Sequence, residues 1–114
     1  HAAQAKILTA LTRHFVLEEG LDLMRVAQAC PLTYTGADLY ALCSDAYLCA
    51  VKDVVALAER MTREGATPEE IEARTDDGPR VEEHHFLQAI RALTPSVTDT
   101  DLQHYKQLQA KYAK

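Results

Sequence analysis

Histidine and cysteine, the side chains that most often bind metals or act as nucleophiles, lack the spacing that such sites require. The five histidines are His1, His14, His84, His85 and His104, and none pairs with a carboxylate or cysteine at a metal-binding interval. His84 and His85 are adjacent, and neighbouring side chains on a helix diverge by about 100°, so the pair is not expected to bind one ion. We therefore expect neither a metal site nor a catalytic residue in this chain.

The three cysteines, Cys30, Cys43 and Cys49, form no C-x-x-C pair, which argues against a zinc ribbon and a thioredoxin-type centre. Each falls on the apolar stripe of a predicted helix or at its edge, as a small buried hydrophobic side chain would. We expect them to pack as free thiols.

Phosphate-binding glycine loops are also missing, but one glycine could serve a ligand. The sequence contains no pair of glycines spaced as in a P-loop and no Gly-Lys dipeptide. Thr35-Gly36-Ala37-Asp38 opens the longest predicted helix with two of the smallest side chains, which would let a flat ring approach the backbone near free N–H donors. Because the same residues also form a helix cap, a capping motif and a ligand platform both stay open.

The elements that must position these residues all have the helical period of apolar residues. The pattern predicts helices over 2–15, 23–30, 37–63, 86–93 and 102–112, and a short one near 68–74. Thr35, Thr67 and Thr98 each have a carboxylate three residues later, the signature of a helix start. The predicted fold class is all-α, a small bundle with one long helix and a C-terminal helix.

One segment, about 62–80, interrupts this pattern with two glycines, two prolines and six acidic residues. We interpret it as a solvated, mobile polar insert. With 114 residues, 47% hydrophobic and 25% charged, the chain otherwise has the size and composition of one folded domain over 1–114.

The charge balance and the lengths of the apolar runs exclude several function classes. Twelve basic against 17 acidic side chains give a formal charge of −5, which argues against a nucleic-acid partner. The longest apolar run, residues 46–51, is far shorter than the roughly 20 residues of a membrane helix. No signal peptide is visible. We expect a monomer that does not insert into membranes.

A longer sequence pattern resembles a known family. Residues 30–46, CPLTYTGADLYALCSDA, look like the C-terminal lid of an AAA ATPase. LTRHF at 11–15 is similar to the first lid helix, and LTPSV at 93–97 to the link into the last one. The likeness covers nearly the whole chain apart from the insert, and it is greatest to the second ATPase domain of the peroxisome-biogenesis branch, in its fungal form.

This resemblance implies a helical lid subdomain that is not an enzyme by itself. The parent domain would bind ATP or ADP with Mg²⁺, whereas the isolated chain would bind no cofactor. The implied partners are the lid's own ATPase core and the adjacent subunits of a heterohexamer of two peroxins. Such a motor extracts the peroxisomal import receptor from the membrane, which implies a cytoplasmic protein, peripheral at the peroxisomal membrane.

Four positions match the family's lid contacts to adenine: Ile7, Leu11, Gly36 and Ala37. Related lids often carry His or Asn at the position of Leu11, so here the contact would be apolar only. Other members place an arginine near Ala37, so a direct contribution to phosphate charge is not expected. Ile7 and Leu11 also lie on the apolar stripe of their helix, so a pure packing role is the alternative for them.

Two other interpretations of the whole chain stay open at this point. One is the lid of a different AAA ATPase, from the valosin-containing or ribosome-biogenesis branch. The other is a free-standing helical protein-interaction module, since any amphipathic bundle of this size would serve.

Overall fold

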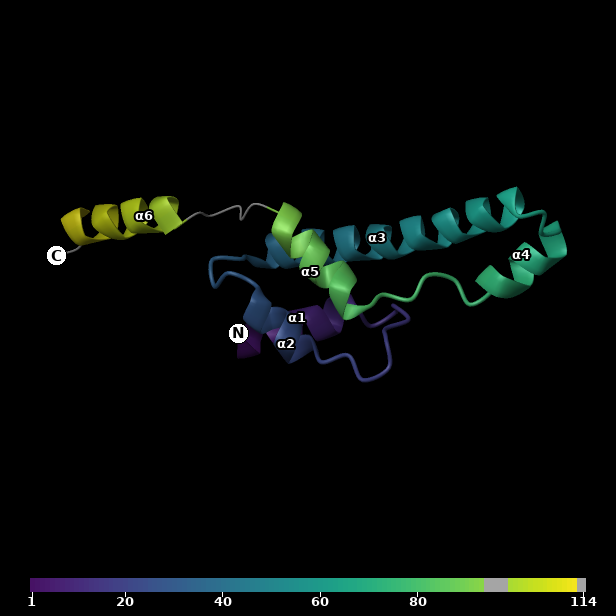
Figure 1. Cartoon of the computed structure of the whole chain (residues 1–114). Helices are drawn as coiled ribbons and strands as arrows, with labels where there is room; N and C mark the ends of the chain where they lie inside the picture. The colour runs from purple at the N-terminus through teal and green to yellow at the C-terminus, as the bar shows by residue number, and fades with distance from the viewer. Residues whose placement is uncertain (94–98, 113–114) are drawn as a thin grey trace.

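The structure, a computed structural model, describes residues 1–93 and 99–112 and has the predicted all-α class (Figure 1). In chain order the helices are α1 (Ala2–Leu11), α2 (Leu23–Ala29), α3 (Gly36–Arg63), α4 (Pro68–Thr75), α5 (Glu83–Ala92) and α6 (Asp99–Tyr112). Within the described residues the strand-like pairing amounts to one isolated parallel bridge, between Leu17 and Val81.

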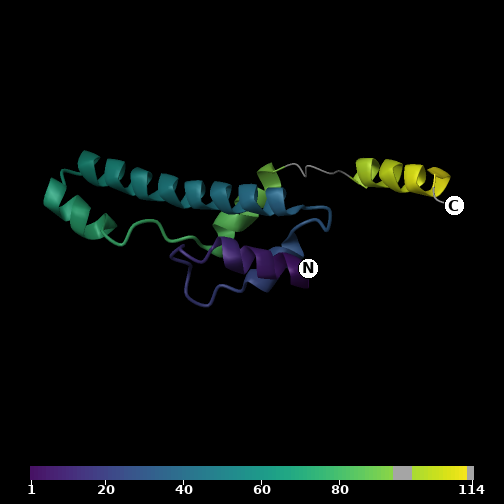
Figure 2. The ribbon, with the colours of Figure 1, turned by 180° about the vertical axis from the view of Figure 1, so that it is seen from behind.

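The body of the molecule is formed by α1, α2 and α5 packed around the N-terminal half of α3 (Figures 1 and 2). α3 contributes the largest share of buried side chains because its apolar residues recur every three or four positions. The fully buried large side chains are Leu8, Val26, Leu39, Leu42, Val81 and Phe86.

Both ends of α3 are fixed by local chemistry. At its start the Thr35 hydroxyl accepts from the amide of Asp38, and the Asp38 carboxylate accepts from the amide of Thr35, the predicted capping box. At its end Gly65 takes a φ of +88°, and the amides of Gly65 and Ala66 donate to the carbonyls of Thr62 and Met61. This is a Schellman arrangement, in which glycine is strongly favoured at the left-handed position.

α1 is shorter than the predicted helix 2–15. It ends at Leu11, where the Thr12 hydroxyl donates to the carbonyl of Leu8 and the amide of Phe15 bonds back to Thr12. The chain then leaves the helix so that the backbone of Val16 and Glu18 can bond to Val81, at 2.8 and 2.9 Å. A contact distant in sequence therefore overrides the local helical pattern.

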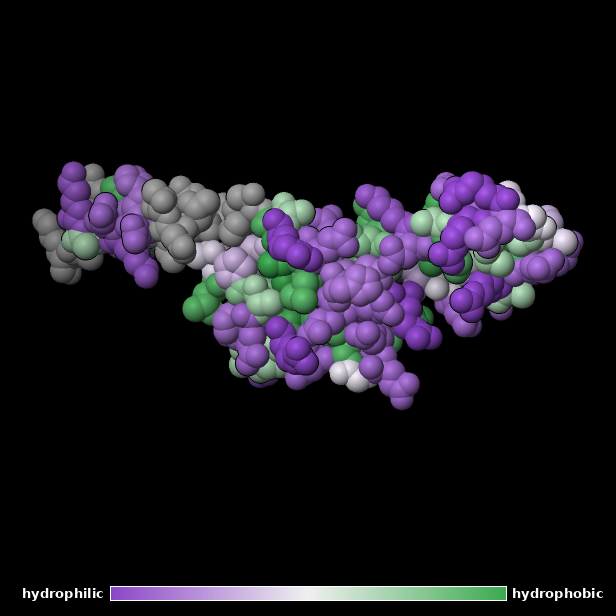
Figure 3. All heavy atoms as spheres, viewed as in Figure 1, coloured by the Kyte–Doolittle hydropathy of each residue, from purple (hydrophilic) through white to green (hydrophobic). Residues whose placement is uncertain are grey.

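The polar insert contains the short helix predicted near 68–74, which is α4 (Pro68–Thr75). The first two residues of the insert, Thr62 and Arg63, still belong to α3, and α4 folds back along the distal end of that helix. We call residues 51–63 of α3 together with α4 the arm. α4 has no buried residue, and hydrophilic side chains cover most of the region around it (Figure 3). Val54, Leu57 and Met61 continue the apolar stripe of α3 but are only half-buried because α3 here extends beyond the body.

α6 lies away from the body (Figure 1). The predicted helix stop before Pro95 and the predicted cap at Thr98 lie outside the described residues, as do the side chains of Leu102, Tyr105 and Tyr112. Among the helices that are described, none combines the length and apolarity needed to cross a bilayer.

Candidate functional site

The four predicted ligand positions lie on two helices that pack against each other, α1 and α3. Ile7 is on the outer side of α1 and 38% exposed, whereas Leu11, one turn later, is half-buried against the core. Gly36 and Ala37 are the first two residues of α3, and both are exposed. The fold thus leaves three of the four side-chain positions open to solvent and gives Leu11 a packing role as well.

The start of α3 is held in place by two hydrogen bonds from distant elements. The side-chain amide of Gln4, on α1, donates to the carbonyl of Pro31 at 3.1 Å. The hydroxyl of Tyr34, which is buried, donates to the carbonyl of Leu93 at 3.0 Å, just past α5. Burial, with smaller effects from Cys30 and Asp38, raises the pKa of Tyr34, so this hydroxyl keeps its proton. The loop before Gly36 therefore links α1, α3 and α5.

Space at Gly36 suits the close approach of a flat group. Its φ is not positive, so the backbone does not require glycine. A Cβ added there would meet no atom within 4 Å. The amides of Gly36 and Ala37 are in the first turn of α3, where no intrahelical carbonyl can accept from them. Backbone donors beside an uncovered surface are what the ligand-platform interpretation requires.

A cavity of about 400 Å³ lies elsewhere. The cavity lies between the arm and residues 76–82, which connect α4 to the body and which we call the strap. α3 contributes apolar side chains such as Val54 and Leu57, whereas the strap contributes Asp77 and Arg80. None of the four predicted ligand positions lines this cavity.

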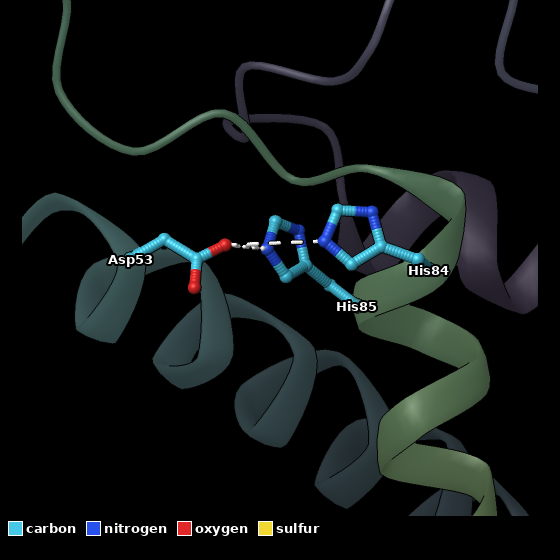
Figure 4. Close-up of side chains that lie close together, drawn as sticks. All are labelled: Asp53, His84 and His85. Atoms are coloured by element: carbon cyan, nitrogen blue, oxygen red, sulfur yellow. Dashed lines mark hydrogen bonds and ion pairs between the residues drawn. The ribbon is translucent and has the colours of Figure 1, made fainter. Parts of the chain in front are cut away.

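The sequence analysis missed a cluster of Asp53, His84 and His85 at the edge of this cavity (Figure 4). Asp53 projects from α3 toward both rings at the start of α5. The Nε2 atom of His85 is 2.6 Å from the Asp53 carboxylate, and that of His84 is 3.9 Å away. The prediction that the two rings diverge was wrong: their centroids are 4.1 Å apart. At the first turn of a helix, side chains can lean toward a partner on another element.

The hydrogen bonds of His85 show why this cluster is structural. Its Nδ1 accepts from the amide of Glu82 at 2.9 Å, completing a capping box for α5 in which histidine replaces the usual glutamate. Since an amide only donates, Nδ1 is unprotonated and Nε2 carries the hydrogen that Asp53 accepts. A metal-binding histidine has the opposite polarity, with its second nitrogen donating to an acceptor. Both ring nitrogens of the buried His85 are engaged, which leaves neither to bind a metal or act as a base.

The buried thiols of Cys30 and Cys43 are poorly reactive because of their surroundings. Cys30 and Cys43 are buried, and all three cysteines are unpaired with one another. Burial raises the pKa of Cys30 to about 11 and, with an added effect of Cys30, that of Cys43 to about 12. At neutral pH both are protonated and therefore poor nucleophiles. The prediction that the cysteines pack as small buried side chains is confirmed for Cys30 and Cys43, whereas Cys49 is only half-buried.

Comparison with solved structures identifies the class of fold. The chain superposes on the FIGL-1 AAA domain in complex with ADP with a TM-score of 0.69 over 97% of this chain and 34% of that one, at 23% identity. A second structure of the FIGL-1 AAA domain gives the same TM-score at 22% identity. The fold is therefore that of the helical part of an AAA domain.

Sequence comparison shows which AAA proteins this chain resembles. The chain is 42% identical to the peroxisomal ATPase PEX6 of Colletotrichum orbiculare, 38% to that of Saccharomyces cerevisiae and 40% to that of Rattus norvegicus. These matches cover 98%, 96% and 98% of this chain but only 9%, 12% and 10% of the relatives, so the chain spans about a tenth of their length. No protein-family model matches it.

Over nearly its whole length the chain thus matches a region of AAA ATPases of the peroxin type, as the resemblance of residues 30–46 predicts.

Proposed function

We propose that this chain is the lid subdomain of a nucleotide-driven motor and that it covers the adenine end of the bound nucleotide. The observation that carries the proposal is Gly36: an exposed helix start with a regular backbone, no neighbour within 4 Å of a Cβ, and free first-turn amides. Folding alone gives no reason for glycine at this position, whereas a flat ring lying against the backbone does.

In this proposal Ile7 and Leu11 provide apolar contact on one side of the adenine, and Gly36 and Ala37 lie against it on the other. The half-exposure of Ile7 fits contact with a ligand better than a purely internal packing role. None of these residues carries a charge, so the lid would contribute binding and orientation. ATP hydrolysis, with Mg²⁺, would depend on the parent's ATPase core, and the chain alone would not be an enzyme.

The links around Gly36 support a coupling role. Because Gln4 and Tyr34 tie the start of α3 to α1 and α5, a displacement of Gly36 by nucleotide would be passed to the whole body. In the parent protein the lid would contact its own ATPase core and the adjacent subunits of a heterohexamer of peroxin one and peroxin six type. That assembly would act in the cytoplasm, at the peroxisomal membrane, to extract the import receptor.

Photolabelling tests the proposed adenine site. In the complete ATPase domain that contains this chain, 8-azido-ATP should label residues within 7–11 or 36–40, and excess ATP should abolish the labelling. Peptide mapping by mass spectrometry identifies the position. Nucleotide-protected labelling confined to α4, α5 or the ATPase core would overturn the assignment.

A further inference from the structure

α3 has a second face that is apolar along its middle, where Leu48 and Val55 are exposed and Val51 and Ala58 are half-buried. Six residues without charge follow one another at alternating intervals of four and three along 44–62, and they are Ser44, Leu48, Val51, Val55, Ala58 and Thr62. We call this row the α3 seam. At 1.5 Å per residue it is about 27 Å long.

The seam lies apart from the side of α3 that faces the body. The core side chains of this helix, Leu39, Leu42, Cys43, Ala46 and Ala50, are buried, whereas Leu48 and Val55 are each 49% exposed. Tyr40 and Tyr47 border the seam and are 64% and 40% exposed. Figure 2 shows the distal part of α3 uncovered on the side toward the viewer.

A row of alternating charge runs beside the seam. Asp45, Lys52 and Glu59 are all exposed and follow one another at intervals of seven residues, which places them along the same edge of the helix. A 3–4 apolar row with charges at one flanking heptad position is the surface by which one helix recognises another in a coiled coil. The spacing of the row therefore indicates that the partner is a helix, and the flanking charges indicate which charges that helix carries.

We propose that the α3 seam docks an amphipathic α-helix from outside this chain, with its own 3–4 apolar row and a positive, negative, positive series of flanking side chains. The partner's apolar residues would fill the holes around Leu48, Val51 and Val55. Its charges would lie opposite Asp45, Lys52 and Glu59.

A second copy of this chain does not meet these requirements. In an antiparallel pair that overlaps the whole seam, Lys52 would face Lys52 and Asp45 would face Glu59, so every flanking pair would repel. In a parallel pair the same charges would face apolar residues such as Tyr47 and Val54. The charge row thus selects a different helix over self-association.

A synthetic helical peptide tests the proposal with the whole 114-residue chain. The probe carries Leu at 3–4 spacing and Lys, Glu and Lys opposite the three charges, and a control peptide has these three charges reversed. Fluorescence anisotropy should show at least tenfold weaker binding of the reversed peptide. The reversed peptide has Lys at its central position, so the variant Lys52→Glu should bind this peptide more tightly than the unaltered chain does.

Matched variants separate docking from folding. Leu48→Glu with Val55→Glu should abolish peptide binding while circular dichroism stays unchanged, and Ala56→Glu, exposed on another face of α3, should leave binding intact. If the double variant unfolds, Val55→Glu alone supplies the same comparison. Equal binding of both peptides, no binding of the matched one, or a dimer of the free chain that Val55→Glu dissociates would overturn the proposal.

Discussion

Two glycines of this chain have opposite reasons for being glycine, and the difference can be measured. Gly65 has a φ of +88° at the end of α3, whereas Gly36 has a regular backbone at its start. Gly65→Ala should lower the free energy of unfolding by about 1 kcal/mol or more, because a Cβ is strained in the left-handed region. Gly36→Ala should leave stability unchanged or slightly higher. Urea denaturation followed by circular dichroism compares the two, and equal losses would contradict this account.

The buried thiols give the chain a specific alkaline sensitivity. Above pH 9 a thiol ionises in the unfolded chain, whereas Cys30 and Cys43 stay protonated until their folded pKa values of about 11 and 12. The unfolded state then binds fewer protons than the native state, so stability falls as the pH rises. Between pH 9.5 and 10.5, the double variant Cys30→Ala with Cys43→Ala should show a slope shallower by up to about 2 × 1.4 kcal/mol per pH unit. Parallel stability curves for the two proteins would refute the assignment.

At the residue scale, the helix caps formed by the usual residue types were predictable from the sequence. The cap of α5, which uses a histidine, was not. The boxes at Thr35 and Thr67 follow from a hydroxyl and an acid three residues apart, and both are present. The box at the start of α5 uses Glu82 and His85. Histidine in that role has no local signature, because its second nitrogen finds Asp53 only once α3 and α5 have packed.

At the scale of elements, His85 joins α5 to α3. His85→Ala should lower the free energy of unfolding by about 2–3 kcal/mol, since it removes the cap of α5, the bond to Asp53 and buried volume. His85→Gln should restore part of this loss because glutamine can reach back to the Glu82 amide. The neighbouring His84→Ala, at an exposed position, serves as control and should change stability by less than about 0.5 kcal/mol. An equal effect of both alanine variants in urea denaturation would contradict the role of His85 in joining α5 to α3.

The boundaries of the elements were predictable where a local signal ends them. Pro31 and the Thr35 box define the gap between α2 and α3, and the structure agrees. The prediction was wrong for the end of α1: the apolar pattern continues to Phe15, but the helix ends at Leu11. The pairing of Leu17 with Val81, 64 residues apart, decides that end, and no periodicity in either segment announces it.

At the scale of the whole molecule, stability should be lower in α4 and in the segments on either side of it than in the body. α4 buries no residue, whereas the body holds the fully buried side chains, so this part of the chain should open locally at lower cost. Limited trypsin digestion should cut first after Arg63, Arg74 or Arg80. Lys52, in the middle of α3, serves as the internal reference. First cuts at Lys52 or at Arg91 in α5, identified by mass spectrometry, would contradict this distribution.

The candidate ligand surface illustrates what a sequence can and cannot indicate. The small residues at 36–37 and the apolar row on α1 are visible in the sequence, and the resemblance to AAA lids links them. That Ile7 is exposed while Leu11 is half-buried depends on the angle at which α1 packs on α3, which local pattern does not specify. The bonds of Gln4 and Tyr34 that orient the start of α3 span 27 and 59 residues and could not be predicted.

The central claim, that Gly36 makes room for adenine, is tested most directly by its replacement with leucine. In the complete ATPase domain, Gly36→Leu should bind ATP at least tenfold more weakly, a loss of about 1.4 kcal/mol, while its melting temperature is unchanged or higher. Ala56→Leu, which places the same leucine side chain at another exposed position of α3, should change neither. Normal ATP affinity in Gly36→Leu, measured by calorimetric titration, would contradict the account.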